Sequence, residues 1–262
     1  MTRIIVNANQ KGGVGKTTLA VNLSGGLVRA NPNNRVLLID ADPQANATAV
    51  FLGISFAAGP RTDADTMYEV LMEQIPASEA LQRVTLAGDA ECVLDILPSH
   101  LDLASAELEL VTIFERERRL RQALAPIQHQ YDYIIIDCPP SLGLLTLNAL
   151  MAATEVLIPV DPGMFPLIGL NLLNRTIEMV RQSNSALQIL GVVPNLQDRT
   201  ALARDTIEQL GQAFGDKLMP AIPRRVAIGE AHAAGQDIFT YDANGDSAEA
   251  FAALLQEVVG RG

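Results

Sequence analysis

Short apolar runs recur along the whole chain, separated by stretches of mixed and more polar composition. Near-continuous apolar runs of this kind are typical of strands that are buried on both faces of a parallel sheet. The six clearest runs are RIIVNA at 3–8, RVLLID at 35–40, CVLDIL at 92–97, YDYIIID at 131–137, EVLIPV at 155–160 and LQILGVV at 187–193.

Most of the intervening stretches are long enough for a helix, as at 16–30, 142–152 and 165–183. Alternating strands and helices predict the α/β class, with a doubly wound, mostly parallel sheet and helices on both of its faces. The chain shows no internal repeat, low-complexity tract or linker. We therefore expect residues 1–262 to form a single domain.

The order of the runs also predicts where a ligand binds. In doubly wound sheets, ligands bind beyond the carboxyl ends of the strands. The loops after residues 8, 40, 137 and 193 are therefore expected to share one site.

Composition narrows the classes of function. A net charge of −11 and a pI near 4.7 argue against a generally basic surface, so any binding to nucleic acid must be local. No stretch predicts a transmembrane helix and the N-terminus lacks the sections of a signal peptide, so we expect a cytoplasmic protein. Cys92 and Cys138 form neither a disulfide framework nor a metal motif, and we expect ordinary buried thiols.

The loop NQKGGVGKTT at 9–18 follows the first apolar run and partly fits the phosphate-loop pattern G-x-x-x-x-G-K-[ST]. Gly15, Lys16 and Thr17 fill its last three places, whereas Gln10 stands where the first glycine belongs. A loop between a strand and a helix can direct backbone amides and a helix N-terminus at one phosphate.

The same loop supplies side chains for nucleotide chemistry. Lys16 is expected to neutralise the β and γ phosphates, the hydroxyl of Thr17 to bind magnesium, and Thr18 to donate to a further phosphate oxygen. A glycine-rich turn that binds nothing is the alternative. The predicted ATP-binding residues of the loop are Lys11, Gly12, Gly13, Val14, Gly15, Lys16, Thr17 and Thr18.

Three carboxylates follow two of the predicted strands. Asp40 and Asp42 end the second run in IDADPQANAT, and Asp137 ends the run in IIIDCPPSLG. One such carboxylate can hold the water shell of magnesium while another orients the attacking water. The alternatives are an Asp-Pro turn with solvated acids and a capped strand end before the Pro139–Pro140 turn.

The segment 99–124 has helix-forming composition with mixed charge. Its arginines are interleaved with Glu115 and Glu117, a pattern that predicts a solvated helix face. A surface for a partner or DNA is the alternative. The arginines are Arg116, Arg118, Arg119 and Arg121.

Together these motifs resemble the ParA/MinD family of deviant Walker ATPases, which have the P-loop NTPase fold, and within it the ParA-type partition proteins. The likeness extends over nearly the whole chain. It rests on KGGVGKTT at 11–18, DADPQANAT at 40–48, IIDCPPSLG at 135–143 and IPRRVAIGEAHAAGQDIFTYDANGDSAEAF at 222–251.

The resemblance implies ATP and Mg²⁺ as cofactors and a homodimer that encloses two ATP molecules. It implies that Lys11 crosses into the partner subunit's nucleotide site and that Asp42 positions the hydrolytic water. Thr17, Asp42 and Asp137 would serve the magnesium site. Asn195 and Pro223 would contact adenine, with a simple turn as the alternative at Asn195.

The resemblance also implies nonspecific duplex DNA and a ParB-like or cargo-adaptor protein as partners, with nucleoid association in the ATP state. Residues 171–225 carry seven basic and five acidic side chains, a net +2, whereas the rest carries 12 and 25, a net −13. The predicted DNA contacts are Arg199, Arg224 and Arg225, and the alternative is that arginines here solvate the surface or pair with Asp198 and Asp205. Where family members often read PRNVR this chain has PRRVA, so Ala227 replaces a DNA-contacting arginine. Since the chain starts at its first strand, we expect no N-terminal helix-turn-helix domain.

Three other classes compete with the partition ATPase. A MinD-like membrane-associated ATPase would end in a basic amphipathic helix, but this chain ends SAEAFAALLQEVVGRG with a single arginine, so we expect no membrane binding. A biosynthetic P-loop enzyme that forms amides shares the loop. A nucleotide-gated scaffold without catalysis is disfavoured because Lys11 and Asp42 are both present.

Overall fold

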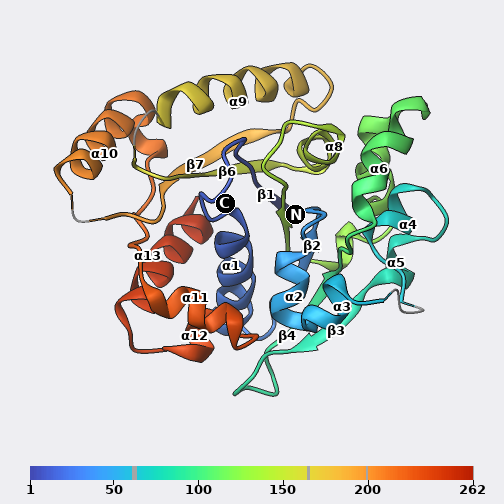
Figure 1. The fold of residues 1–262 in the computed structure, drawn as a ribbon, viewed down its shortest axis with the longest axis horizontal. Coiled ribbons are helices and arrows are strands. Elements are labelled where there is room, and N and C mark those ends of the chain that lie inside the picture. The colour runs from blue at the N-terminus through green and yellow to red at the C-terminus, as the bar shows by residue number, and fades with distance from the viewer. Residues whose placement is uncertain (61–63, 164–165, 199, 262) are drawn as a thin grey trace.

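The computed structural model describes residues 1–60, 64–163, 166–198 and 200–261. Within these ranges the strands form one seven-stranded sheet in the order β3-β4-β2-β5-β1-β6-β7 (Figure 1). The strands are β1 Arg3–Asn7, β2 Val36–Asp40, β3 Gln82–Thr85, β4 Val93–Leu97, β5 Tyr133–Asp137, β6 Glu155–Val160 and β7 Gln188–Pro194.

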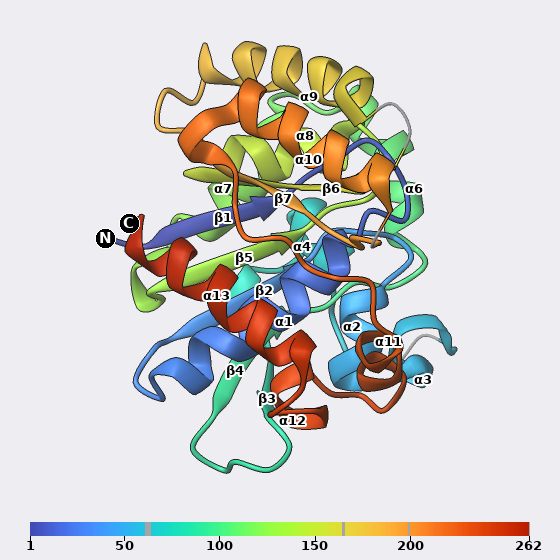
Figure 2. The same ribbon diagram turned by 90° about the vertical axis from the view of Figure 1, so that its left-hand side faces the viewer.

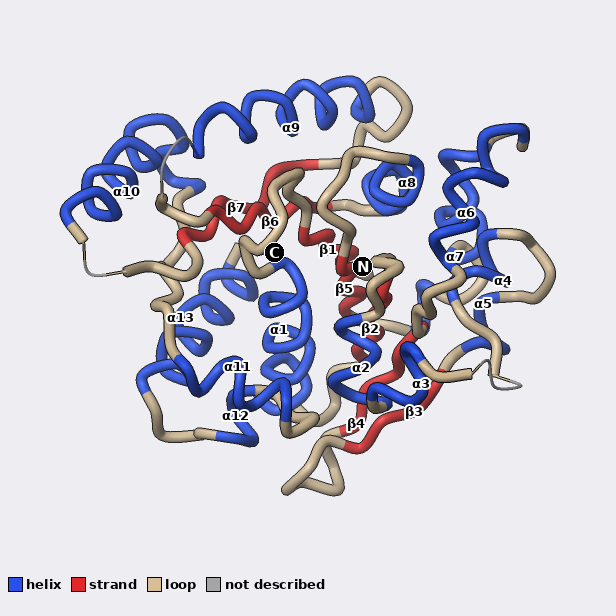
Figure 3. The backbone as a smooth tube through the Cα atoms, viewed as in Figure 1, coloured by secondary structure: helices blue, strands red, loops and turns tan. Residues whose placement is uncertain are grey.

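All six apolar runs are strands, and they pair in parallel. The prediction of a mostly parallel α/β sheet is therefore confirmed. Strand β3 was not predicted: it pairs antiparallel with β4 at the edge of the sheet. Its side chains alternate between half-buried and exposed, so QRVT lacks the apolar run that marks the other strands. Figure 3 shows β3 as a strand beside β4.

Helices cover both faces of the sheet, as predicted (Figures 1 and 2). One face packs against α1 Lys16–Ala30, α2 Asn46–Leu52, α11 Val226–Ala233, α12 Ile238–Tyr241 and α13 Asp246–Gly260. The other packs against α4 Met67–Leu71, α5 Ala77–Ala80, α6 Leu103–Glu109, α7 Arg119–Leu124, α8 Leu144–Ala152, α9 Pro166–Arg181 and α10 Ala201–Phe214. The short helix α3 Ile54–Ala58 follows α2.

Helix α1 is central to the site because it begins directly after the glycine-rich loop. Two glycines in it allow a close approach of other segments: a Cβ at Gly25 would lie 2.9 Å from Asp237, and one at Gly26 would lie 2.8 Å from the Phe239 ring. Helix α13 adds Phe251, which is fully buried. These contacts hold α1, and hence the loop, against the rest of the protein.

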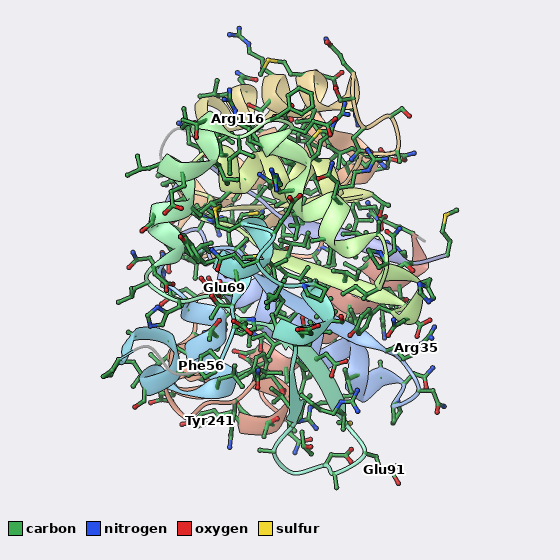
Figure 4. The ribbon with its side chains drawn as sticks, turned by 90° about the vertical axis from the view of Figure 1, so that its right-hand side faces the viewer. Arg35, Phe56, Glu69, Glu91, Arg116 and Tyr241 are labelled. Carbon is green, nitrogen blue, oxygen red and sulfur yellow. The ribbon has the colours of Figure 1, made fainter. Side chains whose placement is uncertain are left out.

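The segment 99–124 is not one helix. It divides into α6, a 3₁₀ turn at Leu110–Thr112, a second at Arg116–Arg118, and α7. Glu115 has φ 53°, in the left-handed region that interrupts a right-handed helix. Arg116 (Figure 4) and Arg121 are exposed, as the solvated-face interpretation requires, but the Arg119 side chain is 14% exposed and pairs with Glu73, so the interpretation holds only in part. Leu108 and Phe114 are exposed too.

Two further predictions concern buried thiols and membrane spans. Cys92 and Cys138 are free and buried, as expected. Among the described helices, none has both the length and the apolar composition needed to span a membrane.

Candidate nucleotide-binding site

The glycine-rich loop connects β1 to α1 and is tied to the neighbouring strand. Gly13 and Gly15 have φ of 72° and 84°, values that favour glycine. Asn9 anchors the loop: its Nδ2 donates to the carbonyl of Pro159 at 2.7 Å, and its Oδ1 accepts from the amide of Lys11 at 3.0 Å. Asn9 immediately precedes the phosphate-loop pattern, and no sequence pattern signals its role.

A second asparagine, Asn195, forms a hydrogen bond with the loop. Asn195 follows β7 and is fully buried, and its Nδ2 donates to the carbonyl of Val14 at 2.7 Å. A Cβ on Gly15 would lie 2.0 Å from that Nδ2. Gly15 is therefore required both by its positive φ and by the close approach of Asn195.

The predicted adenine contacts lie in one region of the structure. Gln197, two residues after Asn195, forms a short parallel bridge with Pro223. The amide of Gln197 donates to the carbonyl of Ile222 at 3.0 Å. The loops after β1 and β7 thus meet, as the sheet order predicted. The adenine role of Asn195 and Pro223 stays a prediction, and the contact that Asn195 makes here is with the loop itself.

The first residues of α1 lie over the buried carboxylates. Lys16 is 6% exposed, and its Nζ donates to the carbonyl of Lys11 at 3.2 Å. Burial lowers the pKa of Lys16, while the nearby Asp137 and Asp42 oppose that shift. Thr17 Oγ1 donates to Asp137 Oδ2 at 2.6 Å, so the structure brings this predicted magnesium pair together.

Asp40 is a buried structural carboxylate. Its Oδ2 accepts from both the amide and the hydroxyl of Thr48 at 2.8 Å, and its Oδ1 accepts from the amide of Asp42 at 3.2 Å. Burial raises the pKa of Asp40 to about 6, and the Thr48 hydrogen bonds oppose the rise. The alternative of an Asp-Pro turn with solvated acids is wrong, since Asp40 is fully buried and Asp42 is 6% exposed.

The carboxylate of Asp42 accepts fewer hydrogen bonds from the described residues than that of Asp40 does. Its Oδ1 accepts from the amide of Gln44 at 2.9 Å. Burial raises its pKa, and Lys16 acts in the opposite direction. Ser99, after β4, donates its hydroxyl to the carbonyl of Asp42 at 2.7 Å and so holds this turn in place. Sequence patterns gave no signal for Ser99.

Asp137 is fully buried beside Asp40, its register partner in the sheet. Burial and the like charge of Asp40 raise its pKa well above the usual range, against the hydrogen bond from Thr17. Its Oδ1 has no hydrogen-bond partner among the described residues. Burial thus disfavours the ionised forms of Asp40, Asp42 and Asp137, and a cation bound beside them would favour those forms.

The donor set fits magnesium bound together with a phosphate. Thr17 and Asp137 offer the hard oxygen ligands that Mg²⁺ prefers. Within the described residues, no group of three or more His, Cys, Asp or Glu side chains is placed to hold a metal ion. A metal here would take remaining ligands from phosphate and water, as Mg²⁺ does in phosphoryl-transfer sites.

Lys11 differs from Lys16 in exposure. Its side chain is 50% exposed, and its Nζ lies 3.5 Å from Asp161 Oδ2. An exposed ion pair of this length contributes at most about 1 kcal/mol, so it does not fix the side chain. Lys11 is therefore able to reach a phosphate outside its own loop.

Two of the three predicted DNA-contacting arginines are described, and both are paired. Arg224 Nε lies 3.2 Å from Asp198, and Arg225 Nη2 lies 3.2 Å from Asp246. Pairing of an arginine with Asp198 is the alternative noted from sequence. Arg199 lies outside the described residues.

Comparison with known proteins identifies relatives that match along most of the chain. A family described as AAA domain matches residues 2–189. The chromosome partitioning protein ParA of Caulobacter vibrioides is 43% identical over 264 residues, covering 99% of this chain and 94% of that protein.

Solved structures share the fold. A plasmid partition protein of Borrelia burgdorferi bound to AMPPNP has a TM-score of 0.82 at 28% identity, with 100% of both chains covered. A Mycobacterium smegmatis structure described as cobyrinic acid a,c-diamide synthase, with ADP and magnesium, has a TM-score of 0.74 at 37% identity. It covers 89% of this chain and 94% of that one.

The brace between Asn195 and the loop gives a testable prediction. Gly15→Ala places a Cβ against Asn195 Nδ2 and at a positive φ, so ATP affinity should fall more than tenfold, or about 1.4 kcal/mol. Gly13→Ala is the control, because its Cβ meets nothing within 4 Å and adds only the φ strain. Isothermal titration measures both. Equal losses in the two variants would show that Asn195 does not constrain the loop.

Proposed function

The chain belongs to the ParA family of partition ATPases, and we propose that it works as an ATP-dependent dimer that binds nonspecific DNA and positions a cargo. It hydrolyses ATP to ADP and phosphate, with Mg²⁺ as the second cofactor. Residues 1–262 are proposed to act as one ATPase domain. The observation that carries it is the contrast between buried Lys16 and exposed Lys11 within one loop.

The loop is proposed to bind the phosphates of ATP. Backbone amides of residues 12–18 and the N-terminus of α1 would surround them, and Lys16 would neutralise the terminal groups. Mg²⁺, when bound, offsets charge on the phosphates, with Thr17 as its protein ligand and Asp42 and Asp137 in its surroundings. The 2.6 Å bond from Thr17 to Asp137 supports this assignment.

Asp42 is proposed to orient the water that attacks the γ phosphate. Its carboxylate is buried and held through the amide of Gln44, yet it lies close enough to Lys16 for the lysine to lower its pKa. Asp40 is unsuited to that role because Thr48 and the Asp42 amide occupy its oxygens. In this proposal Asp40 holds the loop after β2 in place, and Asp42 orients the reacting water.

Lys11 is proposed to reach the nucleotide of a second protomer. Leaving Asp161 costs little because that contact is long and exposed. A flexible ammonium can then neutralise charge on a phosphate across the interface. Each ATP would be bound by two chains, so dimerisation would depend on the nucleotide.

DNA binding is proposed for the segment around Arg199, Arg224 and Arg225. The ion pairs of Arg224 and Arg225 are exposed, with arginine side chains 53% and 32% accessible, so phosphate can compete for both guanidinium groups. A ParB-like or cargo-adaptor protein is proposed to stimulate hydrolysis.

Membrane association is the weaker alternative. The C-terminal helix α13 buries Phe251, Leu254 and Val258 in the core beside α1. Its apolar face is thus already covered, and a helix that docks on lipid needs that face free.

An amide-forming reaction is the second candidate function, because the Mycobacterium smegmatis structure carries that description. A P-loop enzyme of that kind would consume ATP in proportion to a carboxylate substrate and an amine donor. ATP turnover that requires such substrates and needs no partner protein would favour this candidate over partition.

Lys11→Ala should abolish ATP-dependent dimerisation while ATP binding changes little, because Lys16 and the loop amides remain. Sedimentation velocity with and without ATP measures the dimer. Asp161→Asn is the matched control: it releases Lys11 without removing it and should dimerise at least as well as wild type. Dimerisation of Lys11→Ala at the wild-type ATP concentration would contradict the cross-subunit role.

Asp42→Ala should still bind ATP and dimerise, but its turnover should fall about 10²-fold or more because the attacking water loses its orienting carboxylate. Phosphate release, with and without a stimulating partner, is the measurement. Turnover equal to wild type would assign the catalytic role elsewhere.

Wild-type protein with ATP and Mg²⁺ should bind duplex DNA of any sequence, with affinity that falls steeply as salt rises. Arg224→Ala with Arg225→Ala should lower the slope of log K against log[salt] by about 1 for each lost phosphate contact. Arg35→Ala is the control, because Arg35 is also an exposed arginine in an ion pair, with Asp132. Arg35 and Phe56 of α3 lie on opposite sides of the molecule (Figure 4). No binding to any duplex at low salt would refute the DNA proposal.

A further inference from the structure

Asn7 is a buried polar side chain that the mechanism above does not use. It is the last residue of β1 and is fully buried. Neither Nδ2 nor Oδ1 of its carboxamide has a hydrogen-bond partner among the described residues. An unpaired buried amide lowers stability, so its presence beside a phosphate loop calls for a physical reason.

The sheet register places Asn7 in a row with two of the buried carboxylates. Asn7 pairs with Asp137 of β5, and Asp137 pairs with Asp40 of β2. In-register side chains of neighbouring parallel strands point to the same face, about 4.8 Å apart. Alternation with Val6, which packs on the opposite face, puts this row on the face that α1 covers.

Among the described residues, this row leaves one donor group, Asn7 Nδ2, and two acceptors, Asn7 Oδ1 and Asp137 Oδ1, without hydrogen bonds. Asp137 Oδ2 accepts from Thr17, but Asp137 Oδ1 has no partner among the described residues. Asp40 cannot supply a donor when ionised, and both of its oxygens already accept hydrogen bonds. On the other side of Asn7 its register partner is Leu157, which is apolar.

We propose that Asn7 is a positioning residue for the magnesium site, with its Nδ2 donating to Asp137 Oδ1 through one water, since the structure has no direct hydrogen bond between these two atoms. Thr17 and Asn7 would then hold the two oxygens of Asp137 from opposite sides. The carboxylate would be fixed in the orientation that receives a water of the Mg²⁺ shell. The inference rests on the proposed role of Asp137 near the metal.

Mg²⁺-dependent binding of a fluorescent ATP analogue, mant-ATP, by the full chain tests this. Asn7→Leu keeps the volume but removes the donor, so half-maximal tightening of binding should need about tenfold more Mg²⁺ than wild type. Binding in EDTA, which depends on the loop alone, should be unchanged. Asn7→Ser should shift the Mg²⁺ midpoint less than Asn7→Ala, since the two differ in one hydroxyl donor.

Two controls separate the possible failures. Ser24→Ala removes another buried hydroxyl without a partner among the described residues, on α1 and away from the row, and should leave the Mg²⁺ midpoint unchanged. Asp137→Asn should shift the midpoint at least as far as Asn7→Leu.

The outcomes are distinguishable. A shift in Asp137→Asn with none in the Asn7 variants overturns the inference and leaves the proposed function standing. No shift in Asp137→Asn overturns the proposed role of Asp137 as well. A loss of mant-ATP binding by Asn7→Leu in EDTA would make Asn7 a support of the loop and would also overturn the inference.

Discussion

The burial of Asp40, Asp42 and Asp137 under the start of α1 is the constraint on which the rest of the site depends. Carboxylates removed from water cost free energy unless hydrogen bonds or opposite charge stabilise them. The carboxylate of Asp40 accepts hydrogen bonds from within the protein, whereas Oδ1 of Asp137 has no hydrogen-bond partner among the described residues, and burial raises the pKa of both carboxyls. A raised pKa favours the protonated carboxyl in the ligand-free protein, and a Mg²⁺ ion bound with a nucleotide would favour the ionised form.

The fold holds these carboxyls beside a phosphate loop that is already shaped. Asn9 and Asn195 tie the loop to the ends of β6 and β7, and Gly15 allows the close approach of Asn195. Electrostatic preorganisation of this kind favours the transferring phosphoryl group without rearrangement at the moment of reaction. Lys11 is the exception, since its side chain is exposed and its one ion pair within the described part of the chain is the 3.5 Å contact with Asp161. The proposed function thus gives the same loop a fixed lysine for its own nucleotide and a movable one for the nucleotide of a second protomer.

The sequence predicted most of this architecture because buried parallel strands leave strong apolar runs and the phosphate loop has a specific motif. It missed β3, whose QRVT lies at a sheet edge and carries no apolar run, and it treated 99–124 as one helix because its composition hides the positive φ at Glu115. Asp42 and Asp137 were predicted as site residues because carboxylates at strand ends stand out. The sequence could not predict roles for Asn7, Asn9 and Ser99 or the loop contact of Asn195. An amide or hydroxyl becomes informative only once the structure shows what lies beside it.

A crystal structure of the protein with AMPPNP and Mg²⁺ tests the central claim most directly. The account predicts Mg²⁺ bound to Thr17 Oγ1 and a β or γ phosphate oxygen, with Asp137 accepting a hydrogen bond from a metal-bound water. The bond from Asn195 Nδ2 to the Val14 carbonyl should stay near its present 2.7 Å. A metal bound away from Thr17 and Asp137, or a loop that releases Asn195 to admit the phosphates, would contradict the account.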